Sequence, residues 1–473
     1  MAMGKWATER QQDLFITHDR LPKSPGHVFY VKLNKLLAEA GFDVWVEALC
    51  EPYYADGQGR PSLPPGTYFR MLLVGYFEGI ASQRGIAWRC SDSLSLREFL
   101  GIPLGGDKKY DSPDHSALSH IRDRLPLEVH QQVFVKILAI AHQKKLLKGK
   151  TVAVDSTTLE ANAAMKSIVR RDSGEDYDAF LARLMHEQGV VAEHETPDAE
   201  QRRRFDKSRT NKRVSNDEWA SETDPDARIA KMKDGTTHLA YKAEHVVDLD
   251  TEIILAAEVY PADQSDTSTL EDSVQQAQAN QTDAGSDERI EDAVADKGYH
   301  STETVTTMAE ETPYRTYIPE QQRPHRRKWK GKPPKQKRAV NANRRRTRGE
   351  RGKALQRKRS ELAERTFAHV CETGGARRTW LRGIDKVRKR YLIAAAAHNL
   401  SVMMRALFNM GTPRGLQKFK LDMEGLLDDV FSRLDLAWLA IKRLATATRS
   451  RLAVSNRQTE LRKFAAAAPV AAA

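Results

Sequence analysis

The sequence has few cysteines and no long apolar run. Its 473 residues include only Cys50, Cys90 and Cys371, which lie far apart in the chain. This number and spacing argue against a disulfide framework and against a zinc site built from closely spaced cysteines. No apolar run approaches the ~20 residues of a membrane-spanning helix. Residues 1–20 are charged, unlike a signal peptide. We therefore expect a cytoplasmic protein with no membrane partner.

Excess positive charge is confined to one segment. The chain carries a formal net charge of +12. Residues 323–359 contain eighteen Lys or Arg and one acid, Glu350, which gives this segment +17 and leaves −5 for all other residues. Such a concentrated basic block points to a polyanionic partner.

Two short apolar runs each end on an aspartate. Residues 151–155 end at Asp155, and residues 290–296 end at Asp296, just before Lys297-Gly298-Tyr299. Apolar strands belong to a sheet covered on both faces, and the side chain at a strand end lies at the rim where ligands bind. If the strands are neighbours, the two carboxylates can hold Mg²⁺ or Mn²⁺ between them, as phosphodiester cleavage requires. Taken singly, each aspartate is explained more simply as turn or helix-cap chemistry.

The remaining patterns predict an α+β protein. Residues 26–148 have apolar faces at helical spacing, and residues 163–236 are dense in both charge signs. We expect helix at 177–185 and a mobile or solvated stretch at 196–224. From residue 149 the predicted order is strand, insertion, hairpin (238–247 and 252–259), helix (265–278), strand, helix (from 301) and strand (314–318). This order fits a mixed sheet of the RNase H type.

A third acid is sought on the helix predicted to open at residues 360–368. Glu361 and Glu364 are three residues apart and share one helix face. Either could complete a three-carboxylate site. The alternative is a pair of acids on a solvated face.

Several motifs together resemble one family. They are Val154 to Ala163, Ala295 to Tyr299, Leu381 to Arg388, Ala397 to Leu400, Phe69 to Gly79 and Pro113 to Ser116. In these segments the chain resembles bacterial insertion-sequence transposases of the DDE class, over about residues 26–405.

The resemblance implies a DNA-cutting and DNA-joining enzyme on an RNase H-like fold. Asp155 is then the first acid, Asp296 the second and Glu364 the third, with Glu361 as the alternative for the third. Together they would hold two Mg²⁺ or Mn²⁺ ions. The implied partners are double-stranded DNA with terminal inverted repeats, target DNA, and further copies of the chain in a homodimer or larger assembly on DNA. Such a protein would be associated with the nucleoid.

The resemblance also implies a division of the chain into domains. A helical N-terminal domain (26–148) that binds end DNA precedes a catalytic domain (149–405), which carries the charged insertion (163–236) and the basic segment (323–359). A helical C-terminal tail (406–473) follows.

The basic block is expected to bind DNA phosphates without recognising the base sequence. The residues assigned to this contact are Arg326, Arg327, Lys328, Arg344, Arg345, Arg346 and Arg348. The alternative is a solvated, disordered linker. Two other functions stay open: a decayed transposase retained as a DNA-binding repressor, and an RNase H-like nuclease that does not join strands.

Overall fold

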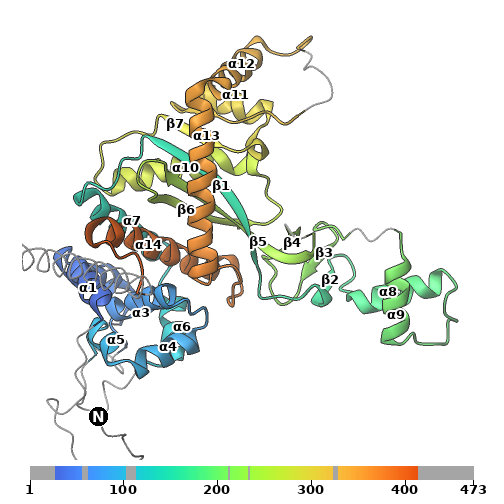
Figure 1. The fold of residues 1–473 in the computed structure, drawn as a ribbon. Helices are drawn as coiled ribbons and strands as arrows, with labels where there is room; N and C mark the ends of the chain where they lie inside the picture. Colours follow the sequence, from blue (N-terminus) through green and yellow to red (C-terminus); the bar gives the residue numbers. More distant parts are fainter. Residues whose placement is uncertain are drawn as a thin grey trace, which may run out of the picture. The chain divides into compact units, whose positions relative to one another are not determined.

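A mixed sheet lies at the centre of the described part of the chain (Figure 1). The computed structural model describes residues 27–55, 62–102, 113–210, 214–232, 235–322 and 329–413. The sheet has the order β4-β5-β1-β7-β8, and β6 pairs with β5. Its strands are β1 (Thr151–Glu160), β4 (Arg228–Lys231), β5 (Thr237–Asp248), β6 (Ile254–Pro261), β7 (Asp292–Ala295) and β8 (Arg315–Tyr317).

The strand directions confirm the predicted fold class. β1 pairs antiparallel with β5 and parallel with β7, and β7 pairs parallel with β8. An antiparallel meander followed by helix-connected parallel strands is the RNase H-like arrangement that the order of elements predicted. The hairpin, the two later strands and the helices between them all lie where the sequence placed them. These helices are α10 (Asp266–Asp283) and α11 (Thr302–Glu311).

Different helices cover the two faces of the sheet. Successive side chains on a strand point to opposite faces. Lys242 of β5 reaches Thr269 of α10, whereas His245 of the same strand reaches Thr366 and Tyr391. These last two residues belong to α13 (Glu350–Phe367) and α14 (Ile384–Phe408). α10 therefore covers one face, and α13 and α14 cover the other.

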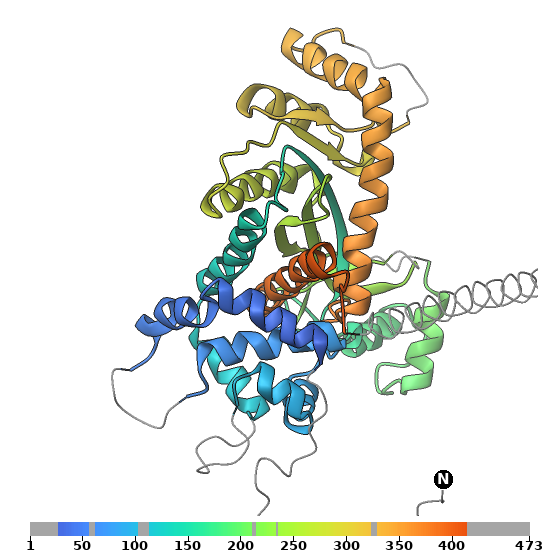
Figure 2. The same ribbon diagram turned by 60° about the vertical axis from the view of Figure 1, so that its left-hand side comes forward.

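The N-terminal helices pack on α14. Figures 1 and 2 both show α14 lying between the sheet and the blue helices. Asn399 fixes α14 to the sheet, because its amide group donates to the Ile254 carbonyl and accepts from the Ile254 amide, each over 2.8 Å. α14 is the one described helix with the length and composition of a membrane span, and 78% of its apolar window is buried. The N-terminal helices are α1 (Val28–Glu39), α2 (Phe42–Cys50), α3 (Pro65–Glu78), α4 (Gln83–Asp92), α5 (Leu94–Phe99), α6 (His115–Arg124) and α7 (Leu127–Gln143).

Three predictions of element boundaries need correction. The first concerns β1, which does not stop at Asp155 but continues to Glu160. Residues 156–160 keep their pairing with β5, and Thr157 and Leu159 are buried. The β-branched threonines and the edge of β5 extend the strand beyond its continuous apolar part.

The second correction concerns the charged insertion, which folds where it is described. The helix predicted at 177–185 is α8 (Tyr177–Glu187). The stretch predicted to be mobile contains α9 (Ala199–Ser208) and β3 (Trp219–Ser221), and β3 pairs with β2 (Ile168–Arg170). A small core of Leu181, Met185, Val191 and Phe205 supports these elements. Leu181 and Met185 have helical spacing, but Val191 and Phe205 are too far from them in the sequence to continue that period.

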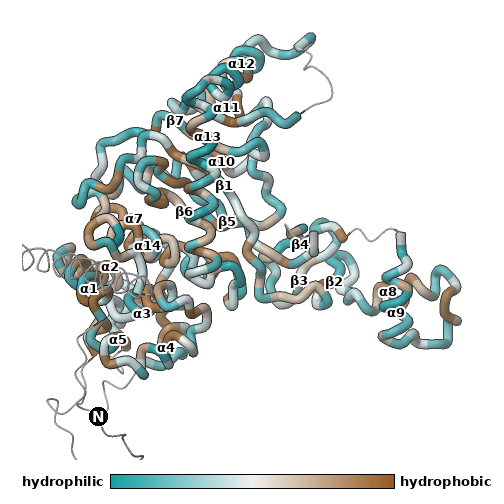
Figure 3. The backbone as a smooth tube through the Cα atoms, viewed as in Figure 1, coloured by the Kyte–Doolittle hydropathy of each residue, from teal (hydrophilic) through white to brown (hydrophobic). Residues whose placement is uncertain are grey.

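The third correction concerns the basic block. Most of its described part is helical, as α12 (Pro334–Arg348) and the first half of α13, so α13 begins ten residues before the predicted start. The hydrophilic α12 is teal in Figure 3. Asn343, which is fully buried, fixes α12 to the sheet through the amide and carbonyl of Ile318. Residues 414–473, most of the predicted tail, lie outside the described residues, and the predicted division into domains stays a prediction.

One buried carboxylate organises the approach to β1. Asp248 is fully buried and accepts hydrogen bonds from the amides of Lys148 and Gly149, each over 3.0 Å. It also accepts from the amide of Asp250 at 2.9 Å and from the hydroxyl of Thr251 at 2.7 Å. The side chain thereby joins the β5–β6 turn to the segment that leads into β1.

We expect Asp248→Asn to lower the free energy of unfolding by about 2–4 kcal/mol, because an amide group has one acceptor oxygen for several buried donors. Chemical denaturation followed by circular dichroism measures the change. Asp250→Asn, at an exposed position of the same turn, is the control and should cost less than about 1 kcal/mol. Equal destabilisation in both variants would contradict this role for Asp248.

Candidate active site

The parallel pairing of β1 with β7 places two aspartates side by side. Val154 is paired with Ala295, so Asp155 and Asp296 occupy the next positions of adjacent strands. Adjacent strands lie about 4.8 Å apart. Asp155 lies within β1, and Asp296 is the first residue after β7. The structure thus brings together the first and second predicted acids.

Asp155 is partly exposed and its charge is balanced by an arginine. Its Oδ1 atom accepts from the amide of Ser156 at 2.9 Å, and its Oδ2 atom lies 3.1 Å from Nη1 of Arg359. The exposed fractions of the two charged side chains are 21% for Asp155 and 12% for Arg359. Arg359 comes from α13, so the ion pair links that helix to the centre of the sheet.

Asp296 borders a cavity of about 520 Å³. Its Oδ1 atom accepts from the amide of Gly298 at 2.7 Å, which begins a 3₁₀ turn, Lys297–Tyr299. Glu320 lines the same cavity and is held by the guanidinium of Arg344 over 2.8 and 2.9 Å. The cavity gives Asp296 access to solvent and to ligands.

A further acid, Asp266, approaches Asp296 from the other side of the turn. A Cβ atom on Gly298 would lie 2.9 Å from Oδ1 of Asp296 and 3.0 Å from Oδ2 of Asp266. Both carboxylates therefore border the space beside this glycine. Oδ1 of Asp266 accepts from Ser156 and from the buried Lys242. From the sequence, Asp266 is predicted only to lie at the start of a helix. The one local pattern that could have indicated a role at the site is its position after the hairpin.

Tyr299 has no access to DNA as a nucleophile. It is fully buried, and its hydroxyl donates to Oε2 of the buried Glu244 at 2.9 Å. Burial, together with the charge of Glu244, raises the pKa of Tyr299 well above its usual value. A tyrosine in this state cannot supply the covalent step of a tyrosine recombinase.

The residues of α13 that face the sheet do not include its two glutamates, Glu361 and Glu364. Gln356 donates to the Ala295 carbonyl, Ala363 is fully buried, and Thr366 meets His245. Glu364 and Glu361 are both exposed. At about 100° per residue, Glu364 lies roughly 100° and Glu361 roughly 160° from Ala363.

The two glutamates differ in what they contact. The carboxylate of Glu361 accepts from the guanidinium of Arg365, which also contacts the buried Glu252. Glu364 lies one turn after Ser360, whose hydroxyl accepts from the same Arg359 guanidinium that pairs with Asp155. Among the described residues, neither glutamate forms a metal-binding group with the two aspartates.

A buried histidine fixes the rotation of α13. Thr366 donates its hydroxyl proton to the Ala363 carbonyl, so Nδ1 of His245 donates to Thr366 at 3.0 Å. Nε2 of His245 then accepts from Tyr391 at 2.8 Å, and the ring stacks on Phe367. Burial lowers the pKa of His245 well below its usual value, which keeps the ring neutral. His245 is the register partner of Asp155, so this clamp acts at the level of the acids.

The oxygen donors at the site suit a hard divalent cation. Mg²⁺ is commonly held by one or two carboxylates and completes its shell with substrate phosphate and water. Asp155 and Asp296 provide two partly exposed carboxylates, and Asp296 lines a cavity. Within the described ranges, no three His, Cys, Asp or Glu residues form a metal-binding group. The two aspartates thus fit a cation whose shell is completed by substrate oxygens and water.

The basic residues fall into two groups. The guanidinium of Arg346 donates to the carbonyl and hydroxyl of Thr316, and Arg344 holds Glu320, so both stabilise the position of α12. Arg345 and Arg348 are exposed. The predicted contacts Arg326, Arg327 and Lys328 lie outside the described residues.

Two family models match the chain. A transposase domain model (DUF772) matches residues 17–124, and a transposase DDE domain model matches residues 148–400, more than half of the chain. No curated protein and no solved structure matches it. The second match contains Asp155, Asp296, Glu361 and Glu364.

Proposed function

Since the chain belongs to the DDE transposase family, we propose that it cuts DNA at the ends of an insertion sequence and joins the freed 3′-OH ends to target DNA. The observation that supports this proposal most directly is the register of β1 and β7, which aligns Asp155 with Asp296. The β1–β7 register therefore supports both the predicted function and the choice of Asp155 and Asp296 as its first two acids.

The proposed chemistry is phosphodiester transfer. Bound Mg²⁺ or Mn²⁺, as two ions, would lower the pKa of an attacking water and stabilise the leaving oxygen. Asp155 and Asp296 would hold the cations, and through these cations the scissile phosphate would be positioned. Water adds to phosphorus and the 3′-oxygen leaves. In the joining step that 3′-OH attacks a target phosphodiester, and a target 3′-oxygen leaves. No bond between protein and DNA is formed.

Glu364 is our proposal for the third acid. It is about 100° from the buried Ala363 around α13, against about 160° for Glu361, and Glu361 accepts from Arg365. A rotation of α13 or a movement of the side chain would have to bring Glu364 toward Asp155, which already contacts α13 through Arg359. Asp266 is proposed as a positioning residue, since it holds Ser156 next to Asp155 and borders Gly298 next to Asp296.

The proposed partners follow from the chemistry. They are double-stranded DNA with terminal inverted repeats and target DNA, bound by a homodimer or a larger assembly that pairs two ends. A bacterial cytoplasm, at the nucleoid, is the place where such DNA is available.

We expect Asp155→Asn and Asp296→Asn each to reduce strand cleavage and strand joining by more than about 100-fold, since removal of even an outer-sphere group at metal sites costs 10- to 100-fold. End binding should persist. Purified variants are compared on labelled DNA carrying the element's ends, in Mg²⁺ and in Mn²⁺. Asp250→Asn is the control, because it removes a carboxylate at an exposed turn outside the site.

The cleavage assay distinguishes three alternatives to the proposal. Near wild-type cleavage by either variant would refute the placement of the metal site. Cleavage without joining by the wild-type protein would favour the nuclease. Binding without cleavage in both metals would favour a DNA-binding relic.

Glu364→Gln should be inactive, and Glu361→Gln should retain cleavage. The reason is their different placement on α13, and each serves as the matched control for the other, since charge and length change identically. Cleavage rates at saturating metal give the comparison. A reversed order would move the third acid one turn back, and equal activity would remove this helix from the metal site.

Replacement of both Arg345 and Arg348 by Gln should weaken binding to all DNA. It should also flatten the slope of log affinity against log salt by roughly 0.9 for each phosphate that the variant no longer neutralises. Sequence preference should survive. Binding titrations at several salt concentrations measure both effects.

The matched control replaces Arg344 and Arg346 by Gln, which removes the same charge from the same helix. These two side chains are engaged within the protein, so the control should chiefly lower the melting temperature. An unchanged slope in the variant of Arg345 and Arg348 would show that α12 does not bind phosphates.

A further inference from the structure

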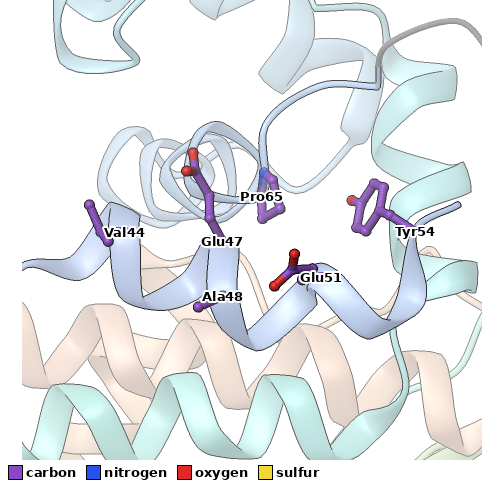
Figure 4. A pocket seen from close by; sticks show the side chains of 6 residues that line it. All are labelled: Val44, Glu47, Ala48, Glu51, Tyr54 and Pro65. Atoms are coloured by element: carbon purple, nitrogen blue, oxygen red, sulfur yellow. The ribbon is translucent and has the colours of Figure 1, made fainter. Parts of the chain in front are cut away.

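A second cavity, of about 510 Å³, lies between the N-terminal helices and the segment that leads into α14. Its lining combines basic and aromatic side chains with an apolar wall, a composition suited to a small organic anion. The residues that matter here are Arg122 and Arg390, Trp380 and Tyr68, and the apolar Leu72 and Ile86. The hollow of about 450 Å³ shown in Figure 4 is different, because Glu47 and Glu51 line it and would repel a phosphate.

Arg122 lacks full hydrogen bonding although it is buried. Its exposed fraction is 7%, and neither Nε nor Nη1 makes a hydrogen bond. Nε lies 3.4 Å from Oδ1 of Asp123, but that oxygen is only 3.1 Å from Nζ of Lys386 as well. One partly exposed carboxylate is thus shared by two cations. A buried guanidinium with unused donors is costly unless an acceptor reaches it.

Arg390 adds a second positive charge. Its Nη2 atom donates to the Gly375 carbonyl at 3.1 Å. Burial, together with the nearby charge of Arg122, lowers the pKa of Arg390 to about 10. A further cation, the buried Lys389, donates to the Arg122 carbonyl and lies 3.8 Å from Asp385. An anion between the two arginines would relieve their repulsion, and guanidinium groups match phosphate geometry.

Trp380 gives the cavity an aromatic wall. Its exposed fraction is 52%, large for a tryptophan. The guanidinium of Arg378 lies over the indole ring, 5.3 Å from its centre. A flat aromatic ring next to two guanidinium groups is an arrangement on which a nucleobase can stack while its phosphate meets the cations.

The segment that carries Trp380 is hydrogen-bonded to β1, the strand that contains Asp155. The Glu160 amide donates to the Arg377 carbonyl, and the Thr379 amide donates to the Glu160 carbonyl, each at 2.9 Å. Nδ2 of Asn162 also donates to the Trp380 carbonyl at 3.0 Å. Asp155 and Glu160 are five positions apart on the strand, a distance of about 16 Å. At about 3.4 Å per nucleotide this corresponds to roughly five nucleotides of one strand.

We propose that this cavity binds a nucleoside phosphate, with the phosphate on Arg122 and Arg390 and the base on Trp380. The nucleoside phosphate is either a free nucleotide or one unpaired nucleotide of bound DNA. The second source rests on the proposed function, and the first does not.

The free-nucleotide arm measures binding of dAMP and of deoxyribose 5-phosphate by calorimetry to the full chain. We expect dAMP to bind about tenfold more tightly, and Trp380→Ala to abolish that difference. Arg122→Lys should weaken both ligands. Trp88→Ala is the matched control, because Trp88 is 69% exposed and does not line the cavity, and it should change nothing. Trp380 is exposed enough that its variant should fold, which melting curves verify.

The DNA arm uses a duplex with one unpaired 2-aminopurine. If the DNA source is correct, wild-type protein changes the 2-aminopurine fluorescence and Trp380→Ala does not. Binding of dAMP alone identifies a free nucleotide, and a response from DNA alone identifies an unpaired nucleotide.

Two results would overturn the inference. One is equal affinity for dAMP and deoxyribose 5-phosphate with no DNA response, which would mean an anion site without a base contact. The other is an identical response of Trp380→Ala and wild-type protein in both arms. If the wild-type protein neither cleaved nor joined DNA in either metal while dAMP binding depended on Trp380, the proposed function would fail and the nucleotide site would stand.

Discussion

The register between β1 and β7 is the constraint on which the site depends. Pairing of Val154 with Ala295 fixes the neighbouring Asp155 and Asp296 at the same level. A slip by one residue would turn one carboxylate to the opposite face, because side chains alternate along a strand. Burial resists that slip, since residues 152–154 and 292–295 are all buried. The apolar bodies of two strands therefore determine the distance between two charges.

Buried polar contacts then position the helices around that pair. His245 holds α13 and α14 at the level of Asp155, and Asn399 and Asn343 each bind both backbone groups of one residue in or next to a strand. Each contact leaves little freedom, because an unpaired donor or acceptor in the interior is costly. These contacts position the helices more specifically than apolar packing, which tolerates small rotations.

The same physical rule separates structural cations from candidate ligand-binding ones. Arg344 and Arg346 have acceptors inside the protein, and Arg359 balances Asp155. Arg345 and Arg348 face solvent, and Arg122 is buried with unused donors. A count of basic residues in the sequence cannot make this distinction, because it depends on acceptors brought from distant segments.

The sequence by itself determined the elements with strong local patterns: the two apolar runs with their aspartates, the hairpin, the helix starts at residues 265 and 301, and the α+β class. It could not show that β1 continues past Asp155, that the insertion has its own core, or that α13 begins at Glu350. Each of these depends on partners far along the chain. Tertiary structure alone decided the alignment of the aspartates, the outward placement of Glu361 and Glu364, the approach of Asp266 and the cavity at Trp380. The physical reason is that periodicity records which side of an element is buried, whereas register, rotation and charge pairing are set by the residues on the other side of the contact.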